Sequence, residues 1–186
     1  MSRNLWVYLT LTLLVVLSWI IADLIEPRRS PLQPSSGHQA DSFSKRFTKL
    51  TMDENGKPKN KLFAEAMVHF KDDDSTELEL PVFTYFKDRS LPWIIHSERG
   101  LISSNRIIRL VTKVKITREA APGIEPVIIN TTNLLINPNY DFAKTEDYAE
   151  LISNHNQLSG VGLSLTFGEN KRIKLHSQVK GKYDAH

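Results

Sequence analysis

A strict alternation of side-chain character over five segments is the sequence feature that most limits what this chain can fold into. Successive side chains of an extended strand point to opposite faces, so alternation with period two predicts strands that bury one face. Turn-forming residues separate the segments, among them Asn55-Gly56 and Asn137-Pro138. Many short strands with such turns are typical of an all-β sandwich or barrel. The alternating segments are Leu62–Phe70, Leu78–Phe86, Ile107–Ile116, Val161–Phe167 and Ile173–Lys180.

Helical patterns are almost absent from the region after Ser42. The one that we find there, around Lys144–Glu150, is weak. The sequence therefore predicts an all-β domain of antiparallel strands over residues 42–186.

The N-terminal region has a different character. Leu5–Ala22 is a run of eighteen residues without a charge, and a helix of that length is about 27 Å long, close to the thickness of the hydrocarbon core of a bilayer. Trp6, Tyr8 and Trp19 lie toward its ends, where interfacial aromatic residues gather. The run is too long for the apolar part of a cleaved signal peptide, and no small-x-small pair ends it. The sequence predicts a transmembrane helix over residues 5–25, after a short cytoplasmic tail of residues 1–4.

Charge counting does not by itself orient this helix, because Arg3 precedes the run whereas Arg28 and Arg29 follow it. The tail of four residues nevertheless leaves all the folded mass on the far side of the membrane. Residues 26–41 contain several Pro, Ser and Gln residues and lack periodicity, so we expect a flexible linker between the helix and the β domain.

Composition and motifs exclude several classes of function. The chain has no cysteine, which rules out a disulfide scaffold, a cysteine-ligated metal and a thiol nucleophile. A net charge of +3 is too small to favour nucleic acid as a partner. A glycine-rich phosphate loop, a nucleophile elbow and a zinc-protease motif are all missing, and the six histidines are scattered. We therefore expect no cofactor, no metal site and no catalytic residue.

One enzymatic alternative stays open as the weakest interpretation. A membrane-tethered glycan enzyme would need two facing carboxylates for acid–base work. The acidic residues that could supply such a pair are Asp141, Glu146, Asp147 and Glu150.

The expected inner face of the β domain is lean. The 40% of apolar residues in the whole chain includes the dense N-terminal run, and several inward positions are small or polar, such as Thr84, Thr112 and Ser177. Either the core is thin but closed, or the sheets leave an apolar slot for an acyl chain, whose burial yields about 0.8 kcal/mol per CH₂. The residues that we expect to line such a slot are Leu62, Ala64, Ala66, Val68, Leu78, Leu80, Val82, Ile95, Leu110, Val114, Ile136, Leu163 and Leu165.

The first and last strands are expected at Phe47–Met52 and Ile173–Tyr183. Open sheet edges attract other strands, and basic side chains on an edge usually protect against aggregation. Residues 160–186 hold five basic and two acidic residues. The alternative to protection is that a partner adds its own strand to this edge.

These segments together resemble the LptC family of lipopolysaccharide export proteins. The resemblance covers essentially the whole chain and rests on the order and spacing of several motifs, none of which is specific alone. They are the short tail and apolar run, the Asn55-Gly56 turn, Leu62–Val68, Glu79–Phe86, Leu91-Pro92-Trp93, Ile94–Ile102 and Ser159–Leu163.

The resemblance implies a twisted, open β-jellyroll of two antiparallel sheets with an apolar groove between them, held at the inner membrane with the β domain in the periplasm. It implies that lipopolysaccharide from the LptB, LptF and LptG transporter passes through this groove to LptA. The helix and the first-strand edge would face LptF and LptG, and the last-strand edge would face LptA. The edge residues expected in these contacts are Phe47, Leu50 and Met52 on the first strand, and Ile173, Leu175, Val179, Lys180 and Tyr183 on the last.

The chain departs from the family pattern in two places. Relatives often have Gly-x-Val where this chain has Thr112-Lys113-Val114, and they can carry a glycine where it has Leu151–Asn154. A glycine at such positions often permits a bulge, so the strand geometry there is open. A rival function also stays open: an anchored β-sandwich that docks envelope partners without carrying lipid.

Overall fold

The computed structural model describes Tyr8, Thr12–Leu14, Val16, Ser18 and residues 40–87, 90–154, 156–167 and 172–182. The chain divides into two units, residues 1–35 and residues 36–186, and each is treated by itself.

The described residues of the first unit are all helical. The Thr12 hydroxyl donates to the Tyr8 carbonyl at 3.1 Å, a bond from residue i to residue i−4 that fits a regular helix. Among the described residues there is no helix with the length and hydropathy of a membrane span. The rest of the predicted span, the tail of residues 1–4 and the predicted linker up to residue 39 lie outside the described residues.

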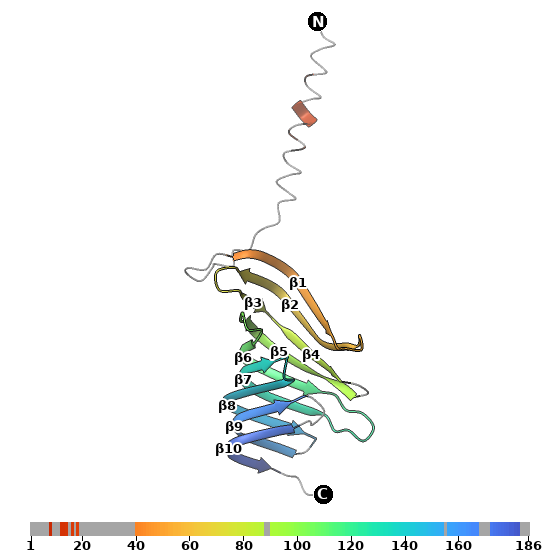
Figure 1. Cartoon of the computed structure of the whole chain (residues 1–186), viewed down its shortest axis with the longest axis vertical. Helices are drawn as coiled ribbons and strands as arrows, with labels where there is room; N and C mark the ends of the chain where they lie inside the picture. Colours follow the sequence, from red (N-terminus) through yellow and green to blue (C-terminus); the bar gives the residue numbers. More distant parts are fainter. Residues whose placement is uncertain are drawn as a thin grey trace. The chain divides into compact units, whose positions relative to one another are not determined.

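The second unit is an antiparallel sheet of ten described strands (Figure 1). The strands follow one another in chain order across the sheet, except that β3 and β4 lie end to end between β2 and β5. The predicted all-β fold is confirmed, and the weak helical pattern at Lys144–Glu150 is wrong, because these residues belong to a strand. The strands are β1 Ala40–Met52, β2 Pro58–Phe70, β3 Ser75–Glu79, β4 Val82–Lys87, β5 Ser90–Ile102, β6 Ile108–Arg118, β7 Val127–Asn137, β8 Phe142–Ser153, β9 Asn156–Thr166 and β10 Arg172–Lys182.

A line of bends crosses the sheet near the middle of the long strands. The pairing register shifts within the ladders that join β5 to β6, β6 to β7, β7 to β8, β8 to β9 and β9 to β10. Such bulges bend a strand and increase its twist. Several residues at this line have a left-handed backbone, namely Arg46, Leu80, Thr112, Asn133, Gly162 and Gln178.

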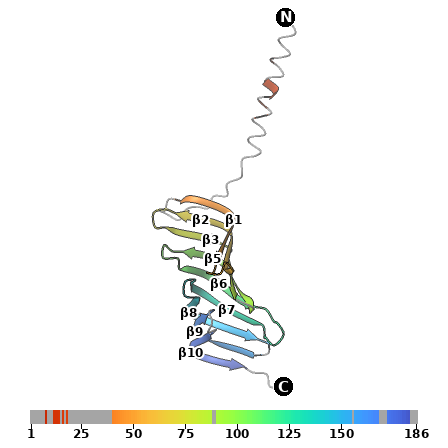
Figure 2. The ribbon, with the colours of Figure 1, turned by 45° about the vertical axis from the view of Figure 1, so that its right-hand side comes forward.

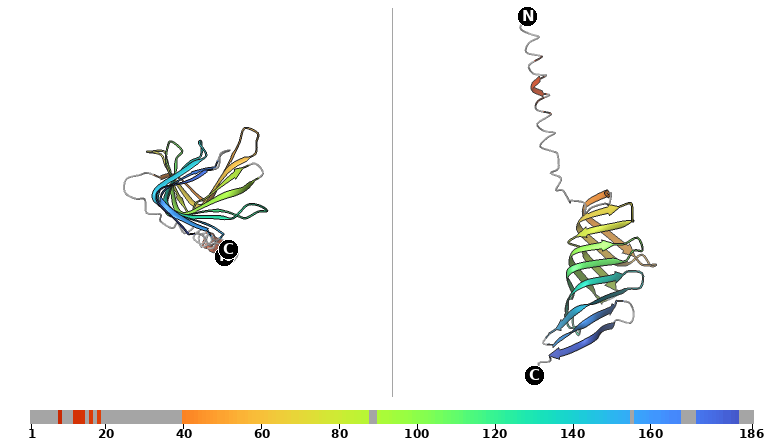
Figure 3. Two further views of the ribbon diagram at one scale, coloured as in Figure 1. Left: turned by 90° about the horizontal axis from the view of Figure 1, so that it is seen from below. Right: turned by 90° about the vertical axis from the view of Figure 1, so that its left-hand side faces the viewer.

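The bends divide the sheet into two halves. The short strand β3 belongs to one half and the short strand β4 to the other, and we name the halves the β3 wall and the β4 wall. The left panel of Figure 3 looks along the stack of strands and shows the ribbons bending and fanning apart. The β4 wall comprises residues 47–52, 58–64, 82–87, 90–97, 113–118, 127–132, 148–153, 156–161 and 179–182. The β3 wall comprises residues 40–45, 66–70, 75–79, 99–102, 108–111, 134–137, 142–145, 163–166 and 172–177.

This arrangement corrects one sequence-based expectation. Two separate antiparallel sheets were expected, whereas the two layers are halves of one continuous sheet. The layers therefore share every long strand, and a ligand between them would lie inside a folded sheet (Figure 2).

Hydroxyl side chains hold the bend line together. A bulge leaves backbone carbonyls without a ladder partner, and such groups need a donor when they are buried. Ser97 donates to the carbonyl of Val111 on the next strand at 2.7 Å. Three similar bonds join neighbouring strands: Thr131 to the Tyr148 carbonyl, Thr145 to the Thr132 carbonyl and Ser177 to the Val161 carbonyl.

The space between the walls is filled by apolar side chains. On the β4 wall, cross-strand partners form a row of Phe83, Ile95, Ile116 and Ile129. On the β3 wall, the partners Leu110 and Leu134 belong to a second apolar row. Each of these residues is at most 2% exposed, so the inner faces of the two walls pack as one core.

Alternation reverses where a strand crosses the bend line, and this overturns the expected facing of four residues. Ala66 pairs with exposed Glu79, and Val68 pairs with exposed Glu77, so both lie on the outer face. Leu80 has φ of 47° and stands in the break between β3 and β4. Beyond this break Phe83 and Tyr85 are buried, and Val82 has moved to the outer side.

Candidate functional site

Nine of the thirteen residues predicted to line an apolar slot are buried between the walls, each at most 4% exposed. They come from both walls and pack into a single cluster. In this conformation they contact one another, so an acyl chain would reach them only by replacing contacts between the walls. The nine are Leu62, Ala64, Leu78, Ile95, Leu110, Val114, Ile136, Leu163 and Leu165.

The structure does not bring the other four into this cluster. Ala66, Val68 and Val82 are half-buried on the outer side of the sheet, and Leu80 is 50% exposed. The strand break at Leu80-Pro81 is the physical cause for Leu80 and Val82, since it shifts the alternation by one residue.

The apolar interior extends across the whole strand stack. Ile108, Ile136 and Ala143 are successive partners on β6, β7 and β8, and Leu165 and Ile173 continue the row on β9 and β10. On the β4 wall, a row of apolar partners crosses seven strands from β2 to β9: Leu62, Phe83, Ile95, Ile116, Ile129, Leu151 and Leu158. Neighbouring strands lie about 4.8 Å apart, so this row is roughly 29 Å long. Such a face suits a long hydrocarbon chain far better than a compact polar ligand.

The two walls also meet through polar and aromatic side chains far from the bend line. Tyr85 on β4 contacts Phe167, which follows β9, with ring centroids 5.2 Å apart. Trp93 on β5 packs edge-on against Phe167 at 6.1 Å. Lys59 on β2 forms an ion pair with Asp141, just before β8, at 3.0 Å. We call Lys59, Tyr85, Trp93, Asp141 and Phe167 the cross-wall cluster.

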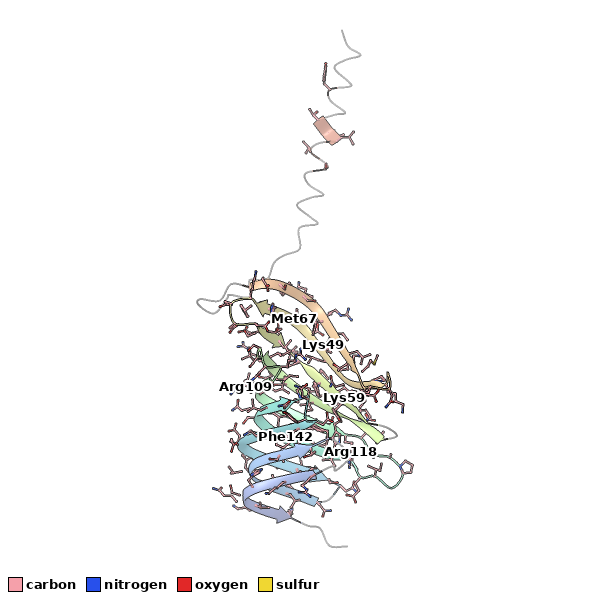
Figure 4. All side chains as sticks on the ribbon, viewed as in Figure 1. Lys49, Lys59, Met67, Arg109, Arg118 and Phe142 are labelled. Atoms are coloured by element: carbon pink, nitrogen blue, oxygen red, sulfur yellow. The ribbon has the colours of Figure 1, made fainter. Side chains whose placement is uncertain are left out.

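Burial and the hydrogen bond to Asp141 raise the pKa of Tyr85 well above its ordinary value. The phenol therefore stays protonated at neutral pH beside the Asp141 carboxylate. The Phe167 amide donates to the Asp141 carbonyl at 2.8 Å, which fixes to each other these two residues, one just before β8 and one just after β9. Arg118, at the end of β6, lies over the Trp93 ring at 5.0 Å (Figure 4 labels Lys59 and Arg118).

Sequence patterns did not identify the cross-wall cluster. Three members lie on three different strands, and Asp141 and Phe167 lie just outside β8 and β9. No local spacing relates Lys59 to Asp141. The pairing of the strands brings them together, so only the folded sheet reveals the cluster.

The predicted edge residues lie on strands that have a neighbour on one side only. Phe47 and Leu175 are half-buried and pack against the core. Tyr183 lies outside the described residues. The remaining edge residues are all exposed: Leu50, Met52, Ile173, Val179 and Lys180.

The acidic residues considered for catalysis have structural partners. Asp141 belongs to the cross-wall cluster, and Asp147 accepts hydrogen bonds from Thr132 and Asn133. Glu150 accepts from Asn130 and Gln157. Within the described part of the chain, no group of three or more His, Cys, Asp or Glu side chains is arranged to hold a metal ion.

Comparison with known proteins adds one match. A family model described as "Lipopolysaccharide-assembly, LptC-related" matches residues 8–184, which is nearly the whole chain. A search of curated proteins finds none that matches.

Proposed function

The chain belongs to the LptC-related family of lipopolysaccharide-assembly proteins, and we propose that it forms the membrane-anchored section of the bridge that carries lipopolysaccharide through the envelope. Family membership makes it a component of lipopolysaccharide transport. In the proposed role it receives the lipid from the LptB, LptF and LptG transporter and passes it to LptA.

The observation that carries this proposal is the apolar interior that runs from one edge strand to the other. Phe47 on β1 and Leu175 on β10 both pack against the core, so the inner face reaches both ends of the stack. When an acyl chain enters between the walls, the core side chains lose apolar contacts with one another and gain apolar contacts with the acyl chain. Its own removal from water contributes about 0.8 kcal/mol per CH₂.

The described helical residues support a membrane anchor. Tyr8, Leu13 and Leu14 are between 65% and 69% exposed. A helix that presents large apolar side chains outward is stable in lipid, where their exposure costs nothing. We propose that this helix lies in the inner membrane with the β domain on the periplasmic side.

One observation favours the rival function, an anchored sandwich that docks partners without carrying lipid. Nine predicted lining residues are closed off in a packed core, and the cross-wall cluster joins the walls a second time. Lipid passage therefore requires the walls to part at this cluster, whereas a docking protein would keep them closed.

Photo-crosslinking separates the two functions. A photoreactive residue is placed at Leu78, which is 3% exposed on the inner face, and at Leu80, which is 50% exposed in the strand break. Each full-length variant is assembled with LptB, LptF and LptG in vesicles that contain lipopolysaccharide. We expect Leu78 to label lipopolysaccharide only when ATP is present, and Leu80 to show no ATP-dependent labelling.

The Leu80 variant is a matched control because it is two residues away on the same segment and points elsewhere. Labelling at Leu78 that is absent, or that is equal with and without ATP, would favour the docking function. Equal ATP-dependent labelling at both positions would mean that lipid does not travel between the walls.

A second experiment tests the role of the β10 edge. The ladder between β9 and β10 passes from Ser177 to Lys180 through a register shift, which leaves Val179 outside the regular pairing. Val179→Pro should therefore disturb the free edge more than the sheet itself. We expect it to abolish capture of LptA and to leave association with LptF intact. Loss of both associations would indicate misfolding instead.

A further inference from the structure

The two edge strands of the sheet match each other in shape. All neighbouring strands are antiparallel, with β3 and β4 sharing one direction, so β1 and β10 run the same way. Arg46 has φ of 53° and stands six residues after the start of β1. Gln178 has φ of 50° and stands six residues after the start of β10.

This match means that β1 of a second copy could extend β10 as a parallel strand with the two bends aligned. Both edges offer free backbone donors and acceptors, which is the usual route to strand-by-strand assembly. Backbone geometry alone would therefore permit head-to-tail chains of this protein.

The charges of the two edges oppose such assembly. β10 carries Arg172, Lys174, Lys180 and Lys182 and no acidic residue. β1 carries Lys45, Arg46 and Lys49 against the single acidic residue Asp41. All seven basic side chains are exposed, and among the described residues none of them forms an ion pair.

The neighbouring strand does not neutralise the charge of β10, because β9 contains no charged residue. Paired strands lie about 4.8 Å apart, well within the screening length of about 8 Å at physiological salt. With the bends aligned, Lys49 lies opposite Gly181, between Lys180 and Lys182, and Arg46 lies two positions from Lys180. The repulsion therefore acts between neighbouring positions of the two strands, within the screening length.

We propose that the shared positive charge of β1 and β10 prevents copies of this chain from joining head to tail, and that it selects for the β10 edge a partner strand with acidic side chains. The proposal deepens the proposed function by giving the chemistry of the partner at β10. It concerns selection between partners and stands apart from lipid carriage.

The register of β10 specifies the pattern of that partner. Ile173 and Leu175 pair with the buried residues Leu165 and Leu163, so they continue the inner face. Lys174 pairs with Ser164 and Lys180 with Ser159, on the outer side. The complementary strand therefore alternates apolar residues toward the interior with acidic residues toward the outside.

Charge reversal on β10 tests the first half of the proposal. The full chain is purified in detergent, and its mass is followed against concentration by light scattering for the wild type and for Lys174→Glu/Lys180→Glu/Lys182→Glu. We expect the wild type to stay monomeric and the variant to form oligomers that dissociate as salt is raised. Adding Lys45→Glu/Arg46→Glu/Lys49→Glu makes both edges acidic, and we expect it to restore the monomer.

The matched control carries three charge reversals on the exposed side of a central strand, Arg109→Glu/Lys113→Glu/Lys115→Glu. It has the same net charge as the β10 variant but no altered edge, so we expect a monomer. A β10 variant that is folded by circular dichroism and stays monomeric overturns the proposal. So does a wild type that assembles through β1 and β10 at physiological salt.

A peptide probe tests the second half. A photoreactive residue at Ser177 of β10 is exposed to two peptides, one alternating Val with Glu and one alternating Val with Lys. We expect crosslinking to the acidic peptide that weakens with salt, and little crosslinking to the basic one. Equal crosslinking to both would refute selection by charge. Neither experiment contains lipid, LptA or ATP, so failure here leaves the proposed function untouched, and failure of lipid carriage leaves these outcomes unchanged.

Discussion

Two bends of the same sheet reach nearly the same backbone conformation with very different residues. Thr112 in β6 has φ of 68°, and Gly162 in β9 has φ of 77°. Glycine adopts this left-handed region freely, whereas a β-branched residue there is an outlier that costs about 1–3 kcal/mol. The neighbouring strands therefore impose the bend, and the residue at the bend determines how much strain results.

The surroundings explain why the two positions tolerate different residues. Thr112 is exposed, so its side chain extends into solvent. Gly162 is buried, and a Cβ atom there would lie 3.1 Å from the Cβ of His176 on β10. A bend on a central strand can accept a side chain on its open side, whereas the bend beside the last strand has no room for one.

The largest effect is expected when a side chain is added at the crowded bend. Gly162→Ala should lower the free energy of unfolding by about 2 kcal/mol, because it combines a strained φ with contact against His176. Gly123→Ala is the matched control: its φ is 75°, but nothing lies within 4 Å of the added Cβ. We expect that control to cost about 1 kcal/mol in urea unfolding. Equal losses would mean that crowding against β10 contributes nothing.

The next effect concerns a bend held by a carboxylate. Asn133 in β7 has φ of 48°, and its side-chain amide donates to Asp147 at 2.7 Å. The Thr132 hydroxyl donates to the same carboxylate at 2.5 Å. Asp147→Ala removes the oxygen that accepts both hydrogen bonds and should cost about 1 kcal/mol. The loss is smaller than for a buried charge because solvent screens this carboxylate.

Glu146→Ala is the control for this prediction. Glu146 precedes Asp147 in sequence and, among the described residues, forms an ion pair only with Lys144, at 3.4 Å on the surface. Such a pair contributes little, so we expect a change within about 0.5 kcal/mol. If both substitutions cost the same in denaturant titrations, the carboxylate does not support the bend.

These bends also explain how much of the fold was predictable. Alternation correctly predicted strands and correctly placed Leu62, Ile95 and Leu110 in the interior, because each lies on a straight stretch. It failed for Ala66 and Val82, where a bend or break shifts the period by one residue. The local sequence around Thr112 does not predict a bend, because the bend results from pairing with the neighbouring strands on both sides.

The lean inner face has a similar explanation. Small and polar inward residues suggested either a thin core or an open slot. The structure places Ser97, Thr131 and Thr145 at the bend line, where their hydroxyls satisfy carbonyls left by the bulges. The three positions that had suggested a lean face do not belong to the interior: Thr112 and Ser177 are exposed, and Thr84 lies on the outer side between buried Phe83 and Tyr85. The cross-wall cluster could not be predicted because its contacts join residues such as Lys59 and Asp141 that no pattern relates.

A smaller effect of opposite sign is expected at the open bend. Thr112→Gly relieves the strained φ but adds backbone freedom to the unfolded chain, so the net gain should be about 0.5–1 kcal/mol. Thr117→Gly, in an extended part of the same strand, should instead lose stability by about 1 kcal/mol. Thermal unfolding of both variants measures the difference. A loss at both positions would show that Thr112 is not strained.

The smallest effect is a pH dependence that distinguishes the carboxylate-held bend from the other two. The hydrogen bonds from Thr132 and Asn133 lower the pKa of Asp147 below its ordinary value of 3.8. A carboxyl group whose folded pKa is depressed stabilises the protein above the unfolded pKa, and this stabilisation is lost as pH falls through the folded pKa. The difference in unfolding free energy between the wild type and Asp147→Asn should therefore be constant from about pH 7 to 5 and shrink below about pH 4. Thr112→Gly changes no ionisable group. Its gain in unfolding free energy over the wild type should therefore be the same at neutral pH and below about pH 4. A gap for Asp147→Asn that stays constant or widens in acid, measured by urea unfolding, would mean that the ionised carboxylate does not hold this bend.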